Sequence, residues 1–272
     1  MRTLLLATAL LAPSQLVSQA APADLARERA DRVQWLSADP LSPARAIALA
    51  TIPPAGLTIG GDASDIPLGT ATSATVREAA GRVTLTGWGP DRTLPAGRAT
   101  ATHGVRLLPF GASGRTQLLV YRDDKPGKRP VYFPYSTAAK LSVTLTPSAP
   151  RVQRILAPDG ATVEATEIGT VAVTFGGAAV PLRVMRVSIG EDESQLLINF
   201  RDGTTGAGTY PAGRFVELIP LGHDRYTLDL NRAFNPYCAY SSIFPCPLPW
   251  SGNTIVARVE AGEKYPAEVV PR

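Results

Sequence analysis

The side chains best suited to chemistry lie together in the last quarter of the chain, between residues 202 and 264. Three carboxylates of this segment, those of Asp202, Asp229 and Glu263, follow apolar stretches that read as successive strands, so the fold can bring them to one place. Two carboxylates in one pocket can divide into a general acid and a general base, as they do in glycoside hydrolysis. Asp202, Asp229 and Glu263 are therefore candidate catalytic residues of a carboxylate-based hydrolase.

Other residues of the same segment are suited to holding a ligand. An arginine binds a carboxylate or phosphate through two parallel hydrogen bonds, and an asparagine both donates and accepts, which suits sugar hydroxyls. Aromatic rings add faces on which a ligand can stack. The candidate ligand-binding residues are Tyr210, Arg214, Asn231, Arg232, Asn235 and Asn253. They predict a polar pocket for one small molecule, a sugar or an anion.

A structural role explains the same residues without any ligand. Asp202 can form an ion pair with Arg214. Asp229 can do the same with Arg232, and the asparagine amides can cap turns. The sequence leaves the three interpretations open. Side chains around one open pocket favour binding or catalysis, whereas side chains consumed by mutual hydrogen bonds favour a structural segment.

Both cysteines of the protein, Cys238 and Cys246, lie in this segment, in a loop stiffened by prolines. In an oxidising compartment they predict a disulfide, which would contribute on the order of 2.5 kcal/mol by closing a short loop. A pair of free buried thiols is the other interpretation. A metal site needs about four ligands, and the two histidines, His103 and His223, lie elsewhere in the chain, so no metal is predicted. Neither histidine neighbours a Gly-x-Ser-x-Gly elbow, which argues against a catalytic triad.

The order and spacing of these motifs resemble a known family. The motif residues are Asp202, Thr204, Gly206, Thr209-Tyr210, Gly213-Arg214, the run from Asp229 to Ala239, Cys246-Pro247-Leu248-Pro249 with Asn253, and Ala261-Gly262-Glu263-Lys264. They resemble the C-terminal motifs of the prokaryotic domain-of-unknown-function family number 1684. The chain departs from that pattern at Leu230, where the family has phenylalanine, and at Tyr237 and Trp250, where it has prolines. The resemblance implies a β-rich domain and carries no established activity.

Alternation of apolar and polar residues predicts strands from Gly81 onward. Many short strands separated by glycine-rich turns are typical of an antiparallel sandwich or barrel. Gly176-Gly177 is the strongest hairpin signal, because tight hairpin turns need positive φ, which glycine adopts without a Cβ clash. Apolar residues at three-to-four-residue spacing predict one amphipathic helix near residues 23 to 37. The predicted fold is all-β, with a short N-terminal helix after a signal peptide.

The chain divides into three predicted parts: a leader at 1–20, a helix with an irregular β segment at 21–80, and an antiparallel β domain at 81–272. The last part ends in the stretch 202–264, called the motif segment below. Residues 40 to 75 are rich in proline and glycine, and they predict irregular structure with one or two short strands.

The first twenty residues have the pattern of a signal peptide. Arg2 precedes an apolar run from Leu4 to Ala12, and Ser18 and Ala20 place small residues at −3 and −1 of a cleavage site. The run is too short to cross a bilayer, which takes roughly 20 residues, and no later segment is long and apolar enough. A secreted or periplasmic protein without a membrane span is therefore predicted.

The charge of the chain indicates no polyanionic partner. Removal of a leader that holds Arg2 and no acidic residue lowers the formal net charge from +4 to +3. The basic cluster Lys125–Arg129 contains a Pro-Gly turn and follows two aspartates, which is typical of a solvated hairpin tip. Zinc spacing, a basic helix and an RNP-like strand are all missing from the sequence, so no nucleic acid is predicted. We predict no cofactor, and the sequence leaves the oligomeric state open.

Overall fold

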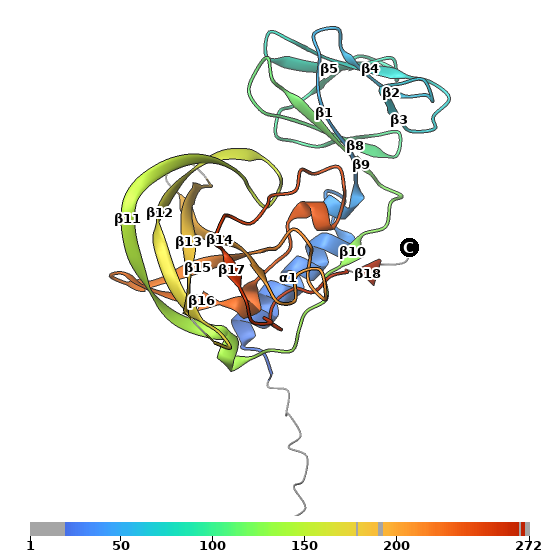
Figure 1. The fold of residues 1–272 in the computed structure, drawn as a ribbon. Helices are drawn as coiled ribbons and strands as arrows, with labels where there is room; N and C mark the ends of the chain where they lie inside the picture. Colours follow the sequence, from blue (N-terminus) through green and yellow to red (C-terminus); the bar gives the residue numbers. More distant parts are fainter. Residues whose placement is uncertain (1–19, 178, 190–192, 267, 270–272) are drawn as a thin grey trace, which may run out of the picture.

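The computed structural model describes residues 20–177, 179–189, 193–266 and 268–269. All but the last residue of the predicted signal peptide lies outside this range. The described chain forms two β-rich lobes, with one helix that accompanies the lower lobe in Figure 1. The all-β fold with one N-terminal helix is confirmed.

The helix α1 spans Ala23–Ala38, as the apolar spacing predicted. Leu25 and Leu36 are buried and lie eleven residues apart, three turns of helix, so they share one face. Asp24 in the first turn complements the positive end of the helix dipole. The cap residue Asp39 is extended, as expected for a residue that precedes proline, and the helix ends there.

Two sheets packed face to face form the first lobe, called the sandwich lobe (upper lobe in Figure 1). One sheet has the order β1-β9-β8-β7 and the other the order β3-β2-β4-β5-β6. The strands are β1 Ala46–Thr51, β2 Leu57–Gly60, β3 Ile66–Pro67, β4 Ala74–Ala79, β5 Arg82–Thr86, β6 Arg92–Leu94, β7 Thr100–Thr102, β8 Val105–Phe110 and β9 Gln117–Arg122. A single apolar core fills the space between the sheets, with Ile59, Val76, Leu107 and Val120 among its buried residues.

For residues 40 to 75, irregular structure with one or two short strands was predicted, and the structure contains more strands than that. Three strands lie wholly inside this segment and a fourth begins there, and all four belong to the sandwich lobe. These strands have two to six residues and are separated by proline and glycine turns, so none is long enough for its alternation to stand out. The predicted division at residue 80 falls in the turn between β4 and β5, which pair as a hairpin.

The second lobe, called the barrel lobe, is a closed ring of strands. Successive antiparallel pairings run β13-β12-β11-β16-β15-β14, and β14 pairs again with β13. Its strands are β11 Lys140–Leu156, β12 Thr162–Thr174, β13 Ala179–Ser188, β14 Ser194–Asp202, β15 Arg214–Gly222 and β16 Arg225–Asp229. Closure leaves no open edge between these six strands. The long strands β11 and β12 curve around the lobe (Figure 1). A register shift interrupts their pairing between Pro147 and Arg151, and another interrupts the pairing of β12 with β13 between Glu167 and Gly169.

The hairpin predicted at Gly176-Gly177 is confirmed. It joins β12 to β13, and the two glycines have φ values of +63° and +155°. The remaining elements are short and position the motif segment. They are β10 Lys128–Arg129, β17 Thr254–Ile255, β18 Glu268–Val269, and the 3₁₀ turns η1 Pro43–Arg45, η2 Thr137–Ala139, η3 Leu230–Arg232 and η4 Tyr237–Ala239. Among the described residues, no helix has the length and apolar character needed to cross a bilayer.

Candidate functional site

Asp202 and Arg214 form a buried ion pair where β14 ends and β15 begins. Arg214 Nη2 donates to Asp202 Oδ2 at 2.8 Å, and both side chains are 1% exposed. Nη1 of Arg214 also donates to the carbonyl of Ala261 at 2.5 Å, and Nη2 donates to that of Val259 at 3.1 Å. Burial lowers the pKa of Arg214, and the charge of Asp202 opposes that shift. This guanidinium fastens the C-terminal residues to the barrel and is not open to a ligand.

The second oxygen of Asp202 is also engaged. Its Oδ1 accepts hydrogen bonds from the amide of Thr204 at 2.7 Å, the hydroxyl of Thr204 at 2.5 Å and the amide of Val259 at 3.2 Å. A carboxylate that is 1% exposed and accepts four hydrogen bonds within the protein is not accessible to a substrate. The turn that carries the Asp-x-Thr motif is therefore a hydrogen-bonded structural unit.

Asp229 and Asn231 organise the turn η3. Asp229 Oδ1 accepts from the backbone amide of Asn231 at 3.0 Å and from its side-chain amide at 2.8 Å. The side chain of Asn231 also pairs with Ser136, accepting from its amide at 2.9 Å and donating to its carbonyl at 2.8 Å. This bidentate contact joins the turn to the segment just before β11.

Asn253 makes a similar bridge on the other side of the lobe. Its side chain accepts from the amide of Arg183 at 2.8 Å and donates to the carbonyls of Arg183 at 3.1 Å and Asn199 at 3.0 Å. Asn253 is fully buried and links β13, β14 and the chain before β17. Its amide therefore satisfies backbone groups.

Glu263 is the most deeply buried acid of the motif segment, with an exposed fraction of 0%. Its Oε2 accepts from Arg32 Nε of α1 at 3.1 Å and from the amide of Asn235 at 2.9 Å. Asn235 in turn donates its side-chain amide to the carbonyl of Lys264 at 2.9 Å. Burial raises the pKa of Glu263, and the positive charge of Arg32 acts in the opposite direction.

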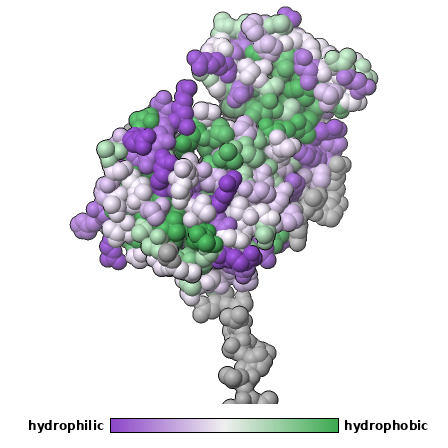
Figure 2. All heavy atoms as spheres, in the orientation of Figure 1, coloured by the Kyte–Doolittle hydropathy of each residue, from purple (hydrophilic) through white to green (hydrophobic). Residues whose placement is uncertain are grey.

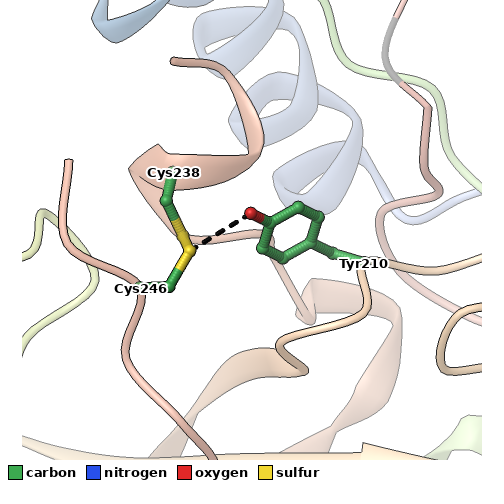
Figure 3. Close-up of a disulfide and its surroundings, with 3 residues drawn as sticks. All are labelled: Tyr210, Cys238 and Cys246. Carbon is green, nitrogen blue, oxygen red and sulfur yellow. Dashed lines mark hydrogen bonds between the residues drawn. A yellow bond between two sulfur atoms is a disulfide. The ribbon is translucent and has the colours of Figure 1, made fainter. Parts of the chain in front are cut away.

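Cys238 and Cys246 lie at disulfide distance, as predicted, with the two Cα atoms 5.6 Å apart. The hydroxyl of Tyr210 lies 3.3 Å from Sγ of Cys246 (Figure 3). The Tyr210 ring meets the ring of Tyr265 edge to face, with centroids 5.0 Å apart. Tyr210 therefore supports the disulfide loop.

Arg232 is the one candidate arginine that reaches the surface, with 21% of its side chain exposed. It forms ion pairs with Asp24 and Glu28 of α1, and its Nε lies 3.6 Å from Asp229 Oδ2. Arg232 thus contacts α1 from the outer side of η3.

A cavity of about 390 Å³ lies between α1 and the motif segment. We call it the helix cavity. Asn231 and Arg232 are the two predicted ligand-binding residues among those that line it. The other lining residues used below are Arg29, Arg32, Trp35, Tyr132 and Phe234. Three guanidinium groups and three aromatic rings therefore surround one space.

Two hydrogen-bond donors beside this cavity lack a partner among the described residues. They are Nε of Arg29 and the hydroxyl of Tyr132, both buried. Arg29 uses Nη2 to bind the carbonyl of Asn231 at 3.0 Å, and its guanidinium carbon lies 4.6 Å from the centre of the Tyr132 ring. Burial raises the pKa of Tyr132, so its hydroxyl stays a neutral donor at neutral pH.

The profile of a family described as "Protein of unknown function (DUF1684)" matches residues 129–264, half of the chain. The chain belongs to this family. The resemblance seen in the motif segment is thus confirmed, and the matched DUF1684 segment also contains the whole barrel lobe.

A solved structure is also similar to this chain. It is the solution NMR structure of an uncharacterized protein of Haloarcula marismortui, with 34% sequence identity, and the match covers 52% of this chain and 78% of that one at a TM-score of 0.44. A comparison with curated proteins finds no match.

The helix cavity joins the DUF1684 segment to a helix outside it. Tyr132, Asn231 and Arg232 lie within the matched residues, and Arg29 and Arg32 come from α1. The helix residues were not among the predicted site residues, because in the sequence Arg29 only interrupts the apolar face of the helix. The signal was present, since Arg29, Arg32 and Trp35 follow at three-residue intervals and so lie on neighbouring turns.

Proposed function

We propose that the protein is a secreted or periplasmic binding protein that holds a small organic carboxylate in the helix cavity. The observation that carries the proposal is that two residues lining a cavity of about 390 Å³, Arg29 and Tyr132, each hold a buried donor without a partner among the described residues, Arg29 Nε and the Tyr132 hydroxyl. A buried donor without an acceptor costs about 1–3 kcal/mol. A carboxylate oxygen from a ligand supplies the missing acceptor.

The wall of the cavity favours a ligand that combines a negative charge with a flat or apolar body. Arg32 and Arg232 are already paired with acids, and Glu28 and Asp31 also line the cavity, so the positive charge for a ligand comes from Arg29, which forms no ion pair with the described residues. The rings of Trp35 and Phe234 provide faces for stacking. The volume lies within the range of small-molecule sites, about 300–1,000 Å³. An aromatic carboxylate or a sugar acid has both properties.

The predicted ligand-binding residues that do not line the helix cavity affect it only by stabilising the surrounding structure. Arg214 and Asn253 are fully buried, and Asn235 holds Lys264. They stiffen the segment that carries Asn231 and Arg232, and a rigid site loses less entropy when a ligand binds. The three candidate carboxylates are bound within the protein, so a hydrolase built on Asp202, Asp229 and Glu263 is not favoured.

Export of the protein rests on two sequence features. The first twenty residues have the charge, apolar run and small residues of a cleavable leader. The Cys238–Cys246 disulfide belongs to an oxidising compartment, and Cys246 is exposed, so a cytosolic reductant would reach it.

Isothermal titration of the purified protein tests the proposal, with benzoate, glucuronate and inorganic phosphate as probes. We expect benzoate or glucuronate to bind at one site, and its addition should raise the melting temperature of the protein. Phosphate has no apolar or flat body to stack on the rings, so it should bind more weakly. A wild-type protein that binds neither benzoate nor glucuronate contradicts the proposal.

Two matched substitutions sharpen the test. Tyr132→Phe and Tyr240→Phe each remove a buried hydroxyl that has no partner among the described residues, and of these two tyrosines only Tyr132 lines the helix cavity. Neither change breaks a hydrogen bond, so both variants should fold. We expect Tyr132→Phe to weaken carboxylate binding about tenfold, equivalent to about 1.4 kcal/mol, and Tyr240→Phe to leave it unchanged. Equal affinities in the two variants would show that the hydroxyl of Tyr132 does not meet the ligand.

A further inference from the structure

One sheet of the sandwich lobe is apolar on both faces. Leu107, Leu118 and Val120 of β8 and β9 point into the core of the sandwich. The residues that alternate with them form the opposite face, where Leu49 of β1 and Leu108 of β8 both lie level with Leu119 of β9. An apolar face of this kind is stable in water only where something covers it.

The barrel lobe covers this second face in part. Phe244 and Cys238 of the disulfide loop pack with Leu119 and Tyr121, whereas Leu49, Leu108 and Phe110 stay partly exposed. In Figure 2, apolar side chains gather on the underside of the sandwich lobe and extend toward the junction of the two lobes. The cover is therefore incomplete.

The uncovered part lines a groove of about 820 Å³ between the lobes. We call it the lobe groove. The sheet forms its floor, with Leu49, Leu108, Phe110 and Leu119. The opposite wall comes from the turn between β11 and β12 and from Phe244 and Pro245 of the disulfide loop.

Polar side chains lie at one end of the apolar floor of the groove. Thr51 of β1 lies level with Gln117 of β9, and Arg115 precedes Gln117 by two residues. All three line the groove, and none of their side chains has a hydrogen bond or an ion pair with the described residues. A guanidinium, an amide and a hydroxyl are thus available at this end for an acceptor.

We propose that the lobe groove is a second binding site, for a fatty acid anion. The acyl chain lies over the apolar floor and the carboxylate meets Arg115, with Gln117 and Thr51 as further donors. The charge is limited to one carboxylate because Asp159, which also lines the groove, repels a second negative group. The site shares no lining residue with the helix cavity, so the two proposals are independent.

Chain length is the first readout of the test. Octanoate, decanoate and dodecanoate are titrated into the full protein, each below its micelle concentration. Each methylene buried in the groove should raise the affinity about fourfold, because burial of one is worth about 0.8 kcal/mol. An affinity that does not depend on chain length, or no binding of dodecanoate at all, overturns the proposal.

The head group is the second readout. Arg115→Gln should weaken dodecanoate binding at least tenfold and leave the binding of dodecanol unchanged. Arg98→Gln is the matched control, since Arg98 is also exposed, lies in a turn of the same lobe and does not line the groove. Dodecyltrimethylammonium should bind more weakly than dodecanoate. Equal dodecanoate affinities in the two variants, or dodecyltrimethylammonium binding as tight as that of dodecanoate, would refute the assignment of the head group.

The two sites are distinguished by measuring how each variant binds the ligand of the other site. Tyr132→Phe should leave dodecanoate binding intact, and Arg115→Gln should leave the binding of benzoate or glucuronate intact. Loss of dodecanoate binding in Tyr132→Phe would show that the fatty acid occupies the helix cavity and would overturn the assignment to the lobe groove.

Discussion

At the scale of single residues, two arginines of the motif segment look alike in sequence and differ in the structure. Arg214 is fully buried with Asp202, whereas Arg232 keeps 21% of its side chain exposed beside Asp24 and Glu28. Removing one partner of a buried ion pair leaves an uncompensated charge, which costs about 3–5 kcal/mol. Exposed ion pairs contribute about 1 kcal/mol or less.

Arg214→Ala should therefore lower the free energy of unfolding by about 3–5 kcal/mol, and Arg232→Ala by about 1 kcal/mol or less. Urea unfolding of both variants measures the difference. Asp202→Asn keeps the shape of the side chain and tests the same pair from the other partner, since it leaves the buried charge of Arg214 uncompensated. Equal losses for the two arginines would mean that Arg214 is not the fastening point of the C-terminal residues.

The buried acid Glu263 predicts a specific pH dependence. Burial raises its pKa above the ordinary value of 4.5. The stability that comes from the neutral form is therefore present below pH 4.5 and is lost as the pH rises through the raised pKa. Glu263→Gln has no such titration, so the difference in unfolding free energy, variant minus wild type, should increase with pH by up to about 1.4 kcal/mol per unit above pH 4.5.

Denaturant unfolding of the two proteins between pH 4 and 8 checks this prediction. Taking the difference removes the contribution of other acids, such as Asp65 and Glu78, whose hydrogen bonds lower their pKa values. A difference that decreases with pH would mean that Arg32 outweighs burial and lowers the pKa of Glu263.

At the scale of elements, α1 is a clamp on the motif segment. Arg32 binds Glu263 through Nε and the carbonyl of Asn235 through Nη2 at 3.0 Å, and Arg29 binds the carbonyl of Asn231. The helix lies against the DUF1684 segment although the whole sandwich lobe separates them in the sequence (Figure 1). The contact positions both walls of the helix cavity.

Arg32→Ala should release this clamp. At a pH above the raised pKa of Glu263, where this acid is charged, the change leaves it without its cation. We expect a loss of about 2–3 kcal/mol there, reduced from the fully buried case because the Arg32 side chain is 19% exposed. Hydrogen exchange should accelerate in α1 more than in β12. Uniform acceleration over both elements would show that the helix does not open separately.

The disulfide loop is the second element with a testable role. Protein from an oxidising compartment should incorporate no alkylating reagent without reductant, and two equivalents after reduction and unfolding, as measured by mass. Reduction should lower the free energy of unfolding by about 2–3 kcal/mol. Two alkylated cysteines in the folded, unreduced protein would exclude the bridge between Cys238 and Cys246.

The sequence predicted the long elements and missed the short ones. Strands such as β12 and β13 carry enough alternating residues to be recognised, and Gly176-Gly177 marks their turn. The strands between residues 46 and 79 are too short, and their partners are set by packing across the sandwich. Ring closure through β13 and β14 is likewise a long-range pairing that periodicity does not encode.

At the scale of the whole molecule, side chains of the motif segment form the contacts that hold α1 and the C-terminal residues on the barrel lobe. The sequence located the polar residues and offered the Asp202–Arg214 pair as one interpretation. It could not choose between a structural segment and a ligand site, because a buried ion pair and a ligand site use the same residue types. Only Asn231 and Arg232 of the predicted ligand residues line the helix cavity. The other walls of the cavity come from α1 and from Tyr132. Nothing in the sequence indicates that α1 and Tyr132 lie beside Asn231 and Arg232.

A crystal structure of the protein with bound benzoate or glucuronate tests the central claim most directly. We expect the ligand in the helix cavity, with a carboxylate oxygen about 3 Å from both Arg29 Nε and the Tyr132 hydroxyl. The ligand body should lie against the ring of Trp35 or Phe234. A carboxylate bound elsewhere on the protein, with these two donors still unpaired or occupied by water alone, would contradict the account.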